Sequence, residues 1–207
     1  EEDAFALARE MVMLGNHAGR KTIAVVTDMD QPLGLAVGNA LEVKEAIETL
    51  RGNGPEDFLT LCMTLGTQML LAGGKAETEA QAEAMLRKVI EDGSALRKLA
   101  QFVEAQGGDA AAVYDTSLLP QAEIVEEVYA REEGCLTRMV CDEIGTCALM
   151  LGGGRETKDS EIDLSVGIVL HKKVGDYVKK GDALAAIYAN DAGKLAAARE
   201  RLSLIHI

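Results

Sequence analysis

Five carboxylates crowd one short stretch of the chain and are the first candidates for acid–base chemistry. They lie between residues 28 and 48: Asp28, Asp30, Glu42, Glu45 and Glu48. Paired carboxylates can donate and accept protons at a reacting centre. Helix carboxylates also commonly face solvent, where Lys44 and Glu48 would form a surface pair worth about a few tenths of a kcal/mol. The residue types alone do not select one of the five as functional.

A second candidate is the glycine-rich stretch Gly152-Gly153-Gly154-Arg155. Free backbone N–H groups and the guanidinium could hold an anion there. The lysine of a phosphate-binding P-loop does not follow, and the stretch comes after a predicted helix rather than between a strand and a helix. These features favour a turn between helix and strand over an anion site.

The histidines and cysteines form no catalytic or metal-binding pattern in the sequence. His17 and His171 stand alone, and no Ser/His/Asp or Cys/His arrangement accompanies them. The cysteines contain no Cys-x-x-Cys pair: Cys62, Cys135, Cys141 and Cys147. We therefore expect reduced, mostly buried thiols, and neither a zinc site nor a disulfide.

The stretch from residue 174 to residue 184 resembles half of the motif of biotinyl and lipoyl carrier domains. Its Gly175-Asp176 and Gly181-Asp182 pairs are typical of turns between short strands. The lysine of a true carrier lies in a hairpin, whereas Lys172 and Lys173 precede the first turn. We expect the strand arrangement without the cofactor; the alternative is a carrier or interaction module modified at Lys172 or Lys173.

The elements that must position these residues begin with a strand, a loop and a helix. Residues 3–15 show helical periodicity, and residues 21–27 form a short β-branched run that is typical of a buried parallel strand. Residues 28–38 are a loop with Pro32, and a helix is predicted from about Asn39, its N-cap, to Arg51. Such a unit places backbone polar groups at the mouth of an α/β sheet, where ligands commonly bind.

The rest of the chain divides into a helical part and a mixed part. Helices are predicted after Pro55, after a capping box at Thr78 and after Ser94 as cap. Strands are predicted at residues 123–129 and 135–139, joined by a turn at residues 132–134, and at residues 166–171, 177–178 and 183–189. Helices are predicted at residues 141–151 and 192–202, so this part is α+β with a boundary near residues 107–120.

Composition limits the partners. The net charge of −13 argues against nucleic acid and anionic membrane as partners, since both attract a basic surface. No apolar run reaches membrane-spanning length, and the thiol pattern is that of a cytoplasmic protein. The chain starts at Glu1 rather than Met, and residues 204–207 are apolar after a charged helix. We therefore expect a fragment whose residues 204–207 are a non-native tail.

Several stretches together resemble the pyrimidine-nucleoside and thymidine phosphorylases. The most specific is residues 27–34, Thr-Asp-Met-Asp-Gln-Pro-Leu-Gly, followed by Val-Gly-Asn-Ala-Leu-Glu-Val at residues 37–43. Others are residues 54–57, 106–109 and 152–158, Ile162-Asp163 with Val166-Gly167, and the Gly175-Asp176 turn. The resemblance covers about residues 1–201, and the Gln-Pro-Leu-Gly sequence is closer to the broad-specificity bacterial pyrimidine enzymes.

The resemblance implies a fold and a reaction. Residues 1–112 would be the latter part of a glycosyltransferase family 3-like α/β domain, and residues 113–203 an α+β domain with a hammerhead-like strand set. The intact enzyme would cleave uridine, thymidine or deoxyuridine with inorganic phosphate, to give the base and a pentose 1-phosphate. The family's Lys-x-Ser-x-Gly phosphate loop, its base-binding residues and its dimer-forming helices would lie upstream. We therefore expect no catalytic or substrate-binding residue in this chain, which would be inactive alone; a related phosphoribosyltransferase is the other enzyme alternative.

One family site falls within the chain. By motif alignment, a potassium ion would take the carbonyls of Leu33 and Ala36 and the carboxylate of Glu45 as ligands. Several oxygens, including backbone carbonyls, can replace the hydration shell of a hard cation. Gly34 and Gly38 permit the backbone angles that turn carbonyls inward. The other ligands would come from the phosphate loop.

Overall fold

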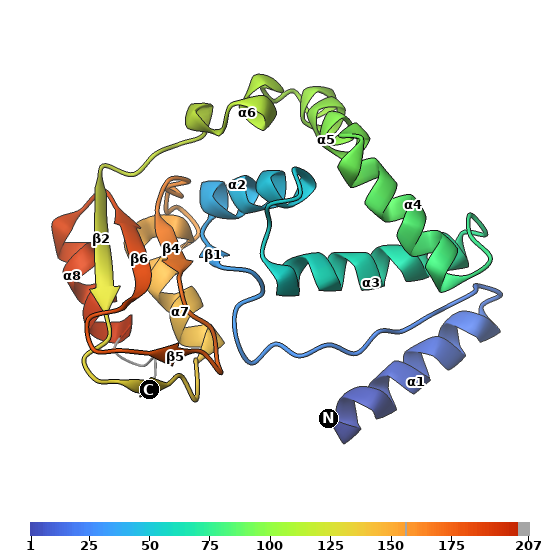
Figure 1. Ribbon diagram of the computed structural model, residues 1–207, viewed down its shortest axis with the longest axis horizontal. Coiled ribbons are helices and arrows are strands. Elements are labelled where there is room, and N and C mark those ends of the chain that lie inside the picture. The colour runs from blue at the N-terminus through green and yellow to red at the C-terminus, as the bar shows by residue number, and fades with distance from the viewer. Residues whose placement is uncertain (156, 203–207) are drawn as a thin grey trace.

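The computed structural model describes residues 1–155 and 157–202 and has two parts, which are linked by a chain connection and by one strand that the first part contributes to the sheet of the second (Figure 1). The first part contains, in order, α1 (Glu2–His17), β1 (Ala36–Val37), α2 (Asn39–Leu50), α3 (Glu56–Ala72), α4 (Glu79–Glu91) and α5 (Ser94–Ala105). A connection with α6 (Ala111–Tyr114) and a 3₁₀ turn (Thr116–Leu118) leads to the second part. That part contains β2 (Ile124–Tyr129), β3 (Gly134–Cys135), α7 (Cys141–Ala148), a π-helical turn (Leu149–Gly153), β4 (Gly167–Leu170), β5 (Tyr177–Val178), β6 (Ala183–Ala189) and α8 (Ala192–Arg201). The predicted tail, residues 204–207, lies outside the described residues.

Local signals set the helices of the first part. Thr78 accepts a hydrogen bond from the Gln81 amide at the start of α4, and the Gln81 side chain accepts one from the Glu77 amide. This confirms the Thr78 half of the predicted capping box, whereas the Gln81 side chain binds the amide one residue before the cap and not that of Thr78 itself. A small core closes the helices where Ile47 of α2 packs with Ala100 of α5 and Val113 of α6. In Figure 1, α3, α4 and α5 form an arc beside α2.

The second part is built on a four-stranded antiparallel sheet in the order β1-β4-β6-β2. The core side chains Ile168, Leu170 and Ile187 lie on the two central strands and are fully buried. α7 and α8 pack with this core through side chains such as Cys147 and Leu195. The outer strand β1 comes from the first part, because Ala36 lies opposite Val169 in the sheet. The loop that leads into β1 is therefore attached to a sheet built mainly from the end of the chain.

Two strand predictions are wrong. Residues 21–27 form no strand, and Ile23 in this run is 43% exposed. A buried parallel strand needs neighbours to pair with its backbone groups, and none of the described strands pairs with this run. The strand predicted at residues 123–129 forms as β2, but the one predicted at residues 135–139 is reduced to β3, and the two do not pair with each other, because β2 pairs with β6 and β3 pairs with β5. Here long-range pairing replaces the local turn that sequence patterns favour.

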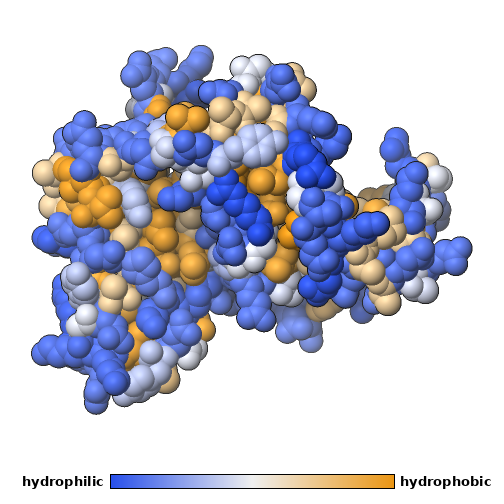
Figure 2. Space-filling view, turned by 45° about the horizontal axis from the view of Figure 1, so that its top comes forward, coloured by the Kyte–Doolittle hydropathy of each residue, from blue (hydrophilic) through white to orange (hydrophobic). Residues whose placement is uncertain are grey.

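α1 is amphipathic but contributes no buried residue. Leu14 is 68% exposed, and Phe5 and Met11 are exposed as well. Lys21, which follows α1, donates a hydrogen bond to the Leu71 carbonyl at the end of α3. Figure 2 shows, on another face of the molecule, apolar patches that interrupt a largely hydrophilic surface. None of the helices in residues 1–155 and 157–202 combines the length and hydrophobicity needed to cross a bilayer.

Candidate cation-binding loop

The loop from residue 31 to residue 36 is where the two parts of the chain meet. Its centre is Gly34, which has a φ of 68° in the left-handed region. A Cβ on Gly34 would lie 2.2 Å from Oε2 of Glu45, a separation that real contacts do not reach. Both the backbone angle and the close approach of Glu45 therefore require glycine here.

Glu45 lies in the second turn of α2 and binds this loop directly. Its Oε1 accepts hydrogen bonds from the amides of Leu35, at 2.8 Å, and Ala36, at 3.0 Å. Burial raises the pKa of Glu45 above its ordinary value, although the two amides and the charge of Lys173 act in the opposite direction. The site thus holds a partly desolvated carboxylate whose negative charge is incompletely compensated.

Lys173 reaches the same loop from the connection between β4 and β5. Its ammonium donates hydrogen bonds to the carbonyls of Pro32 and Gly34, the latter at 2.7 Å, and lies 2.9 Å from Oδ2 of Asp57. Asp57, in the first turn of α3, also accepts a 3.1 Å hydrogen bond from the Gly34 amide. Partial burial acts to raise the pKa of Asp57, but the hydrogen bond and charge of Lys173 outweigh it, so the pKa lies below its ordinary value.

The predicted ligands Leu33, Ala36 and Glu45 are close in the chain but face different spaces. Ala36 and Glu45 line a cavity of about 410 Å³, together with Pro55 and Tyr188. Leu33 lines another cavity of about 800 Å³, which Asp57 and Lys173 also line. The structure therefore brings Ala36 and Glu45 to one cavity, whereas Leu33 lines the other. No group of three His, Cys, Asp or Glu side chains in the described residues could hold a metal, so a cation here would depend on carbonyl oxygens.

The other carboxylates of the cluster have separate structural contacts. Glu42 accepts a hydrogen bond from the Gly38 amide at the start of α2. Glu48 pairs with Arg51 at 2.6 Å, so the expected pairing with Lys44 is wrong. Asp28 accepts a hydrogen bond from the Asp30 amide. The cluster therefore does not form one acid–base pair.

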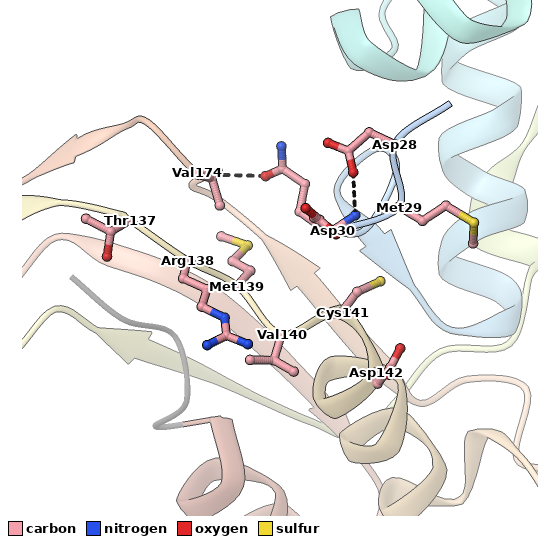
Figure 3. Close-up of a pocket in the computed structure, with 11 residues that line it drawn as sticks. Asp28, Met29, Asp30, Thr137, Arg138, Met139, Val140, Cys141, Asp142 and Val174 are labelled. Atoms are coloured by element: carbon pink, nitrogen blue, oxygen red, sulfur yellow. Dashed lines mark hydrogen bonds between the residues drawn. The ribbon is translucent and has the colours of Figure 1, made fainter. Parts of the chain in front are cut away.

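Asp28 and Asp30 line a third cavity, of about 490 Å³, which Figure 3 shows. Cys141 and Asp142, at the start of α7, line it from the opposite side, and the Arg138 side chain lies nearby (Figure 3). A dashed line in Figure 3 marks the hydrogen bond from the Val174 amide to the side chain of Gln31. This bond is another link between the loop and the β4–β5 connection.

The glycine-rich stretch packs against the start of α2. Asn39 does not cap its helix as predicted, because Gly38 is the N-cap and Asn39 the first helical residue. The Asn39 side chain instead donates a 2.8 Å hydrogen bond to the Gly153 carbonyl. Gly152, with a φ of 107°, forms a kink inside the π-helical turn. These contacts favour the turn interpretation of residues 152–155 over an anion site.

The remaining candidates also have structural roles. His171 lies 2.9 Å from the Glu127 carboxylate across the sheet. The cysteines are free, but only Cys147 is buried while Cys62 and Cys135 are exposed, so the prediction of mostly buried thiols is wrong. Lys173 is held by three oxygens and is not presented as a carrier lysine would be. Of the two lysines considered, only Lys172 makes no hydrogen bond or ion pair in the described part of the chain.

Comparison with known proteins adds sequence relatives to this geometry. The chain is 56% identical to a pyrimidine-nucleoside phosphorylase of Geobacillus stearothermophilus over 188 residues and 55% identical to one of Bacillus subtilis (strain 168) over 190 residues. These alignments cover 91% and 92% of this chain. Residues 135–204 match the family described as the pyrimidine nucleoside phosphorylase C-terminal domain, and residues 1–96 match the a/b domain of a glycosyl transferase family. The chain belongs to the pyrimidine-nucleoside phosphorylase family.

The match is to part of each relative. The aligned segment is 43% of the Geobacillus phosphorylase and 44% of the Bacillus phosphorylase, so the chain spans less than half of their length. The family a/b domain and C-terminal domain agree with the mixed α/β structure and its small antiparallel sheets. Sequence reasoning found Glu45 through the family resemblance but missed Lys173 as a loop contact. Periodicity carries no signal for a contact between residues 139 positions apart.

Proposed function

We propose that these residues are the C-terminal part of a pyrimidine-nucleoside phosphorylase. The full-length protein, meaning the complete polypeptide that contains them, would cleave uridine, thymidine or deoxyuridine with inorganic phosphate. The products would be the free base and ribose or deoxyribose 1-phosphate. The observation that carries this proposal is the identity of 49–56% to proteins of that name over about nine tenths of the chain.

The proposal divides the reaction between this chain and the rest of the protein. Attack of phosphate on C1′ passes through an oxocarbenium-like state and needs an anion site and donors to the departing base. The Lys-x-Ser-x-Gly sequence that the resemblance implies for the anion site does not occur in these residues. We therefore expect the chain alone to be inactive, and its contribution to be the shaped loop at residues 31–36. The division into residues 1–112 and 113–203, the cytoplasmic location and a homodimer formed through segments outside this chain belong to the same proposal.

We also propose that the loop takes part in a potassium site through the carbonyls of Leu33 and Ala36 and the carboxylate of Glu45. The donors fit this ion, since potassium prefers oxygen ligands and Glu45 is a partly buried carboxylate with a raised pKa. The charges fit as well. Glu45 and Asp57 bring two negative charges to the loop, and Lys173 pairs with Asp57. One negative charge is then left for a monovalent cation.

The reaction is tested by its dependence on phosphate. The full-length protein is incubated with uridine or thymidine, with and without inorganic phosphate, and release of the base is followed by absorbance. We expect release only with phosphate, together with formation of the pentose 1-phosphate. Equal release without phosphate would indicate a hydrolase instead, and a reaction dependent on pyrophosphate would indicate the related phosphoribosyltransferase.

The potassium site is tested by a readout that does not need activity. The pKa of Glu45 is measured by carbon-13 NMR of its carboxylate in potassium chloride and in tetramethylammonium chloride at equal ionic strength. A bound cation stabilises the charged form, so we expect a lower pKa in potassium chloride. The carboxylate of Glu48, which is paired with Arg51, is the internal control and should not respond. A Glu45 pKa that is the same in both salts would remove the site.

A further inference from the structure

The ammonium of Lys173 has all its donors engaged at the loop. An ammonium group has three N–H donors, and three oxygens contact this one: the carbonyls of Pro32 and Gly34 and Oδ2 of Asp57. The Lys173 side chain is only 18% exposed. A partly buried ammonium is stable when its donors are satisfied, so this geometry favours one fixed position for the side chain.

The two carbonyls bound by Lys173 flank Leu33. The Pro32 carbonyl belongs to the Pro32–Leu33 peptide group and the Gly34 carbonyl to the Gly34–Leu35 peptide group, so Lys173 fixes these two peptide groups. The Leu33–Gly34 peptide group lies between them, and its N–H is bound by Asp57. Neighbouring bonds join the same two segments: the Val174 amide donates to the Gln31 side chain, and the Leu170 amide donates to the Leu35 carbonyl. Lys173 is the charged member of this set.

Asp57 brings a third element, the start of α3, into contact with the loop and with Lys173. Its carboxylate accepts from the Gly34 amide as well as from Lys173, so the start of α3 and the β4–β5 connection hold Gly34 between them. On the other side of the loop, Glu45 holds the amides of Leu35 and Ala36. The loop is thus set by one ammonium and two carboxylates from three different elements.

We propose that Lys173 is a positioning residue for the loop at residues 31–36. Its ammonium fastens the loop to the β4–β5 connection and sets the orientation of the peptide groups before and after the one that carries the Leu33 carbonyl. The effect of Lys173 on potassium binding rests on the proposed function, because the Leu33 carbonyl is one of the potassium ligands that we propose. The attachment of the loop to the β4–β5 connection does not depend on the proposed function, because it rests on the contacts of Lys173 with Pro32, Gly34 and Asp57.

The test compares hydrogen exchange in four forms of the full-length protein, in buffer without potassium: wild type, Lys173→Met, Lys173→Arg and Lys172→Met. Methionine keeps an unbranched side chain but has no donor, arginine keeps the charge, and Lys172 is the matched control. The amides of Gly34, Leu35 and Ala36 are followed by NMR, with β6 amides as a measure of global stability. Hydrogen bonds to charged groups contribute roughly 1.5–3 kcal/mol, so we expect exchange at least about tenfold faster in Lys173→Met.

Lys173→Arg should restore most of the protection, Lys172→Met should match wild type, and the β6 amides should be unchanged in all four forms. Loop exchange in Lys173→Met equal to that in Lys172→Met would overturn the inference. If Lys173→Met also loses protection in β6, Asp57→Asn decides in its place. This variant removes one ammonium contact with little change in shape, and should speed exchange at Leu35 and Ala36, whose amides are bound by Glu45 and not by Asp57. Unchanged rates at these two amides would again overturn the inference.

The functional consequence is measured separately. The potassium concentration for half-maximal phosphorolysis should rise several-fold in Lys173→Met and return toward wild type in Lys173→Arg. A wild-type protein with no potassium response would remove the proposed site but leave the exchange result for Lys173 intact. Failure of the proposed potassium site and failure of the proposed role of Lys173 therefore give different results.

Discussion

Gly34→Ala is the sharpest test of the loop geometry. The substitution adds one methyl group at a residue with a φ of 68°, directly toward the carboxylate of Glu45. Gly74 is a matched control, because its φ is 65° and a Cβ there would meet nothing within 4 Å. The same substitution at Gly74 therefore measures the backbone effect without the contact.

The expected magnitudes follow from these two contributions. Placing an L-residue in the left-handed region costs roughly 1–2 kcal/mol, which applies to both variants. At Gly34 the methyl group also displaces Glu45, whose Oε1 accepts the amides of Leu35 and Ala36. Losing the acceptor of a partly buried amide costs about 1–3 kcal/mol. We therefore expect Gly34→Ala to lower the free energy of unfolding by about 2–5 kcal/mol, against about 1–2 kcal/mol for Gly74→Ala.

The measurement is urea unfolding of the full-length protein followed by circular dichroism, completed as a double-mutant cycle with Glu45→Ala. In the Glu45→Ala background the carboxylate is gone, so the cost of alanine at position 34 should fall to that at position 74. Equal costs at both positions in the wild-type background would refute the close approach of Glu45 to Gly34. So would a cost at position 34 that Glu45→Ala leaves unchanged.

Three further predictions concern the core, the start of α2 and the pH dependence of stability. Ile187→Ala, on the central strand β6, should lower the free energy of unfolding in urea by about 2–5 kcal/mol; a loss below about 1 kcal/mol would contradict the buried position. Asn39→Ala removes the donor to the Gly153 carbonyl and should cost about 1 kcal/mol in the same assay, whereas no loss would mean that this bond is absent in solution. Urea midpoints measured across acid pH should separate the two carboxylates. Stability due to Asp57 is present above its ordinary pKa of 3.8 and is lost below it, whereas Glu45, with a raised pKa, makes stability fall as pH rises above 4.5. Asp57→Asn should remove the first dependence and Glu45→Gln the second, and profiles that match wild type would contradict these assignments.

Sequence patterns predicted what local interactions decide. The helices around residues 39–50, 79–91 and 192–201 follow from periodicity and stop signals, and the cap at Thr78 forms as its motif predicts. The run at residues 21–27 has the composition of a buried strand, yet Ile23 is exposed because no described strand pairs with the run. The composition of a segment shows whether it could form a strand, whereas strand formation also requires a neighbouring strand with which its backbone can pair.

The candidate site shows the same division. Glu45 could not be separated from four other carboxylates by residue type, and only the family resemblance selected it. In the structure, Glu45 is the one of the five that accepts amides from residues 31–36. The contacts that Lys173 and Asp57 make at the loop carried no signal in the sequence, because they join segments that are far apart in the chain.

The arrangement of charges explains why such contacts matter for a cation. A carbonyl ligand binds well only if its direction is fixed before the ion arrives, because otherwise the ion must order the loop at the expense of affinity. In this loop the ordering comes from Asp57 and Lys173 on one side and from Glu45 on the other. Lys173 is positive, yet it lies against Asp57 and the backbone carbonyls of Pro32 and Gly34, so it can order the loop while leaving the charge of Glu45 largely uncompensated. A neutral side chain at position 173 would leave the loop less ordered, and a second ammonium beside Glu45 would neutralise the charge that the proposed ion would balance. Lys173 avoids both outcomes, because it orders the loop without lying against Glu45. It can do so because the connection between β4 and β5, which carries Lys173, lies next to the point where the loop enters the sheet.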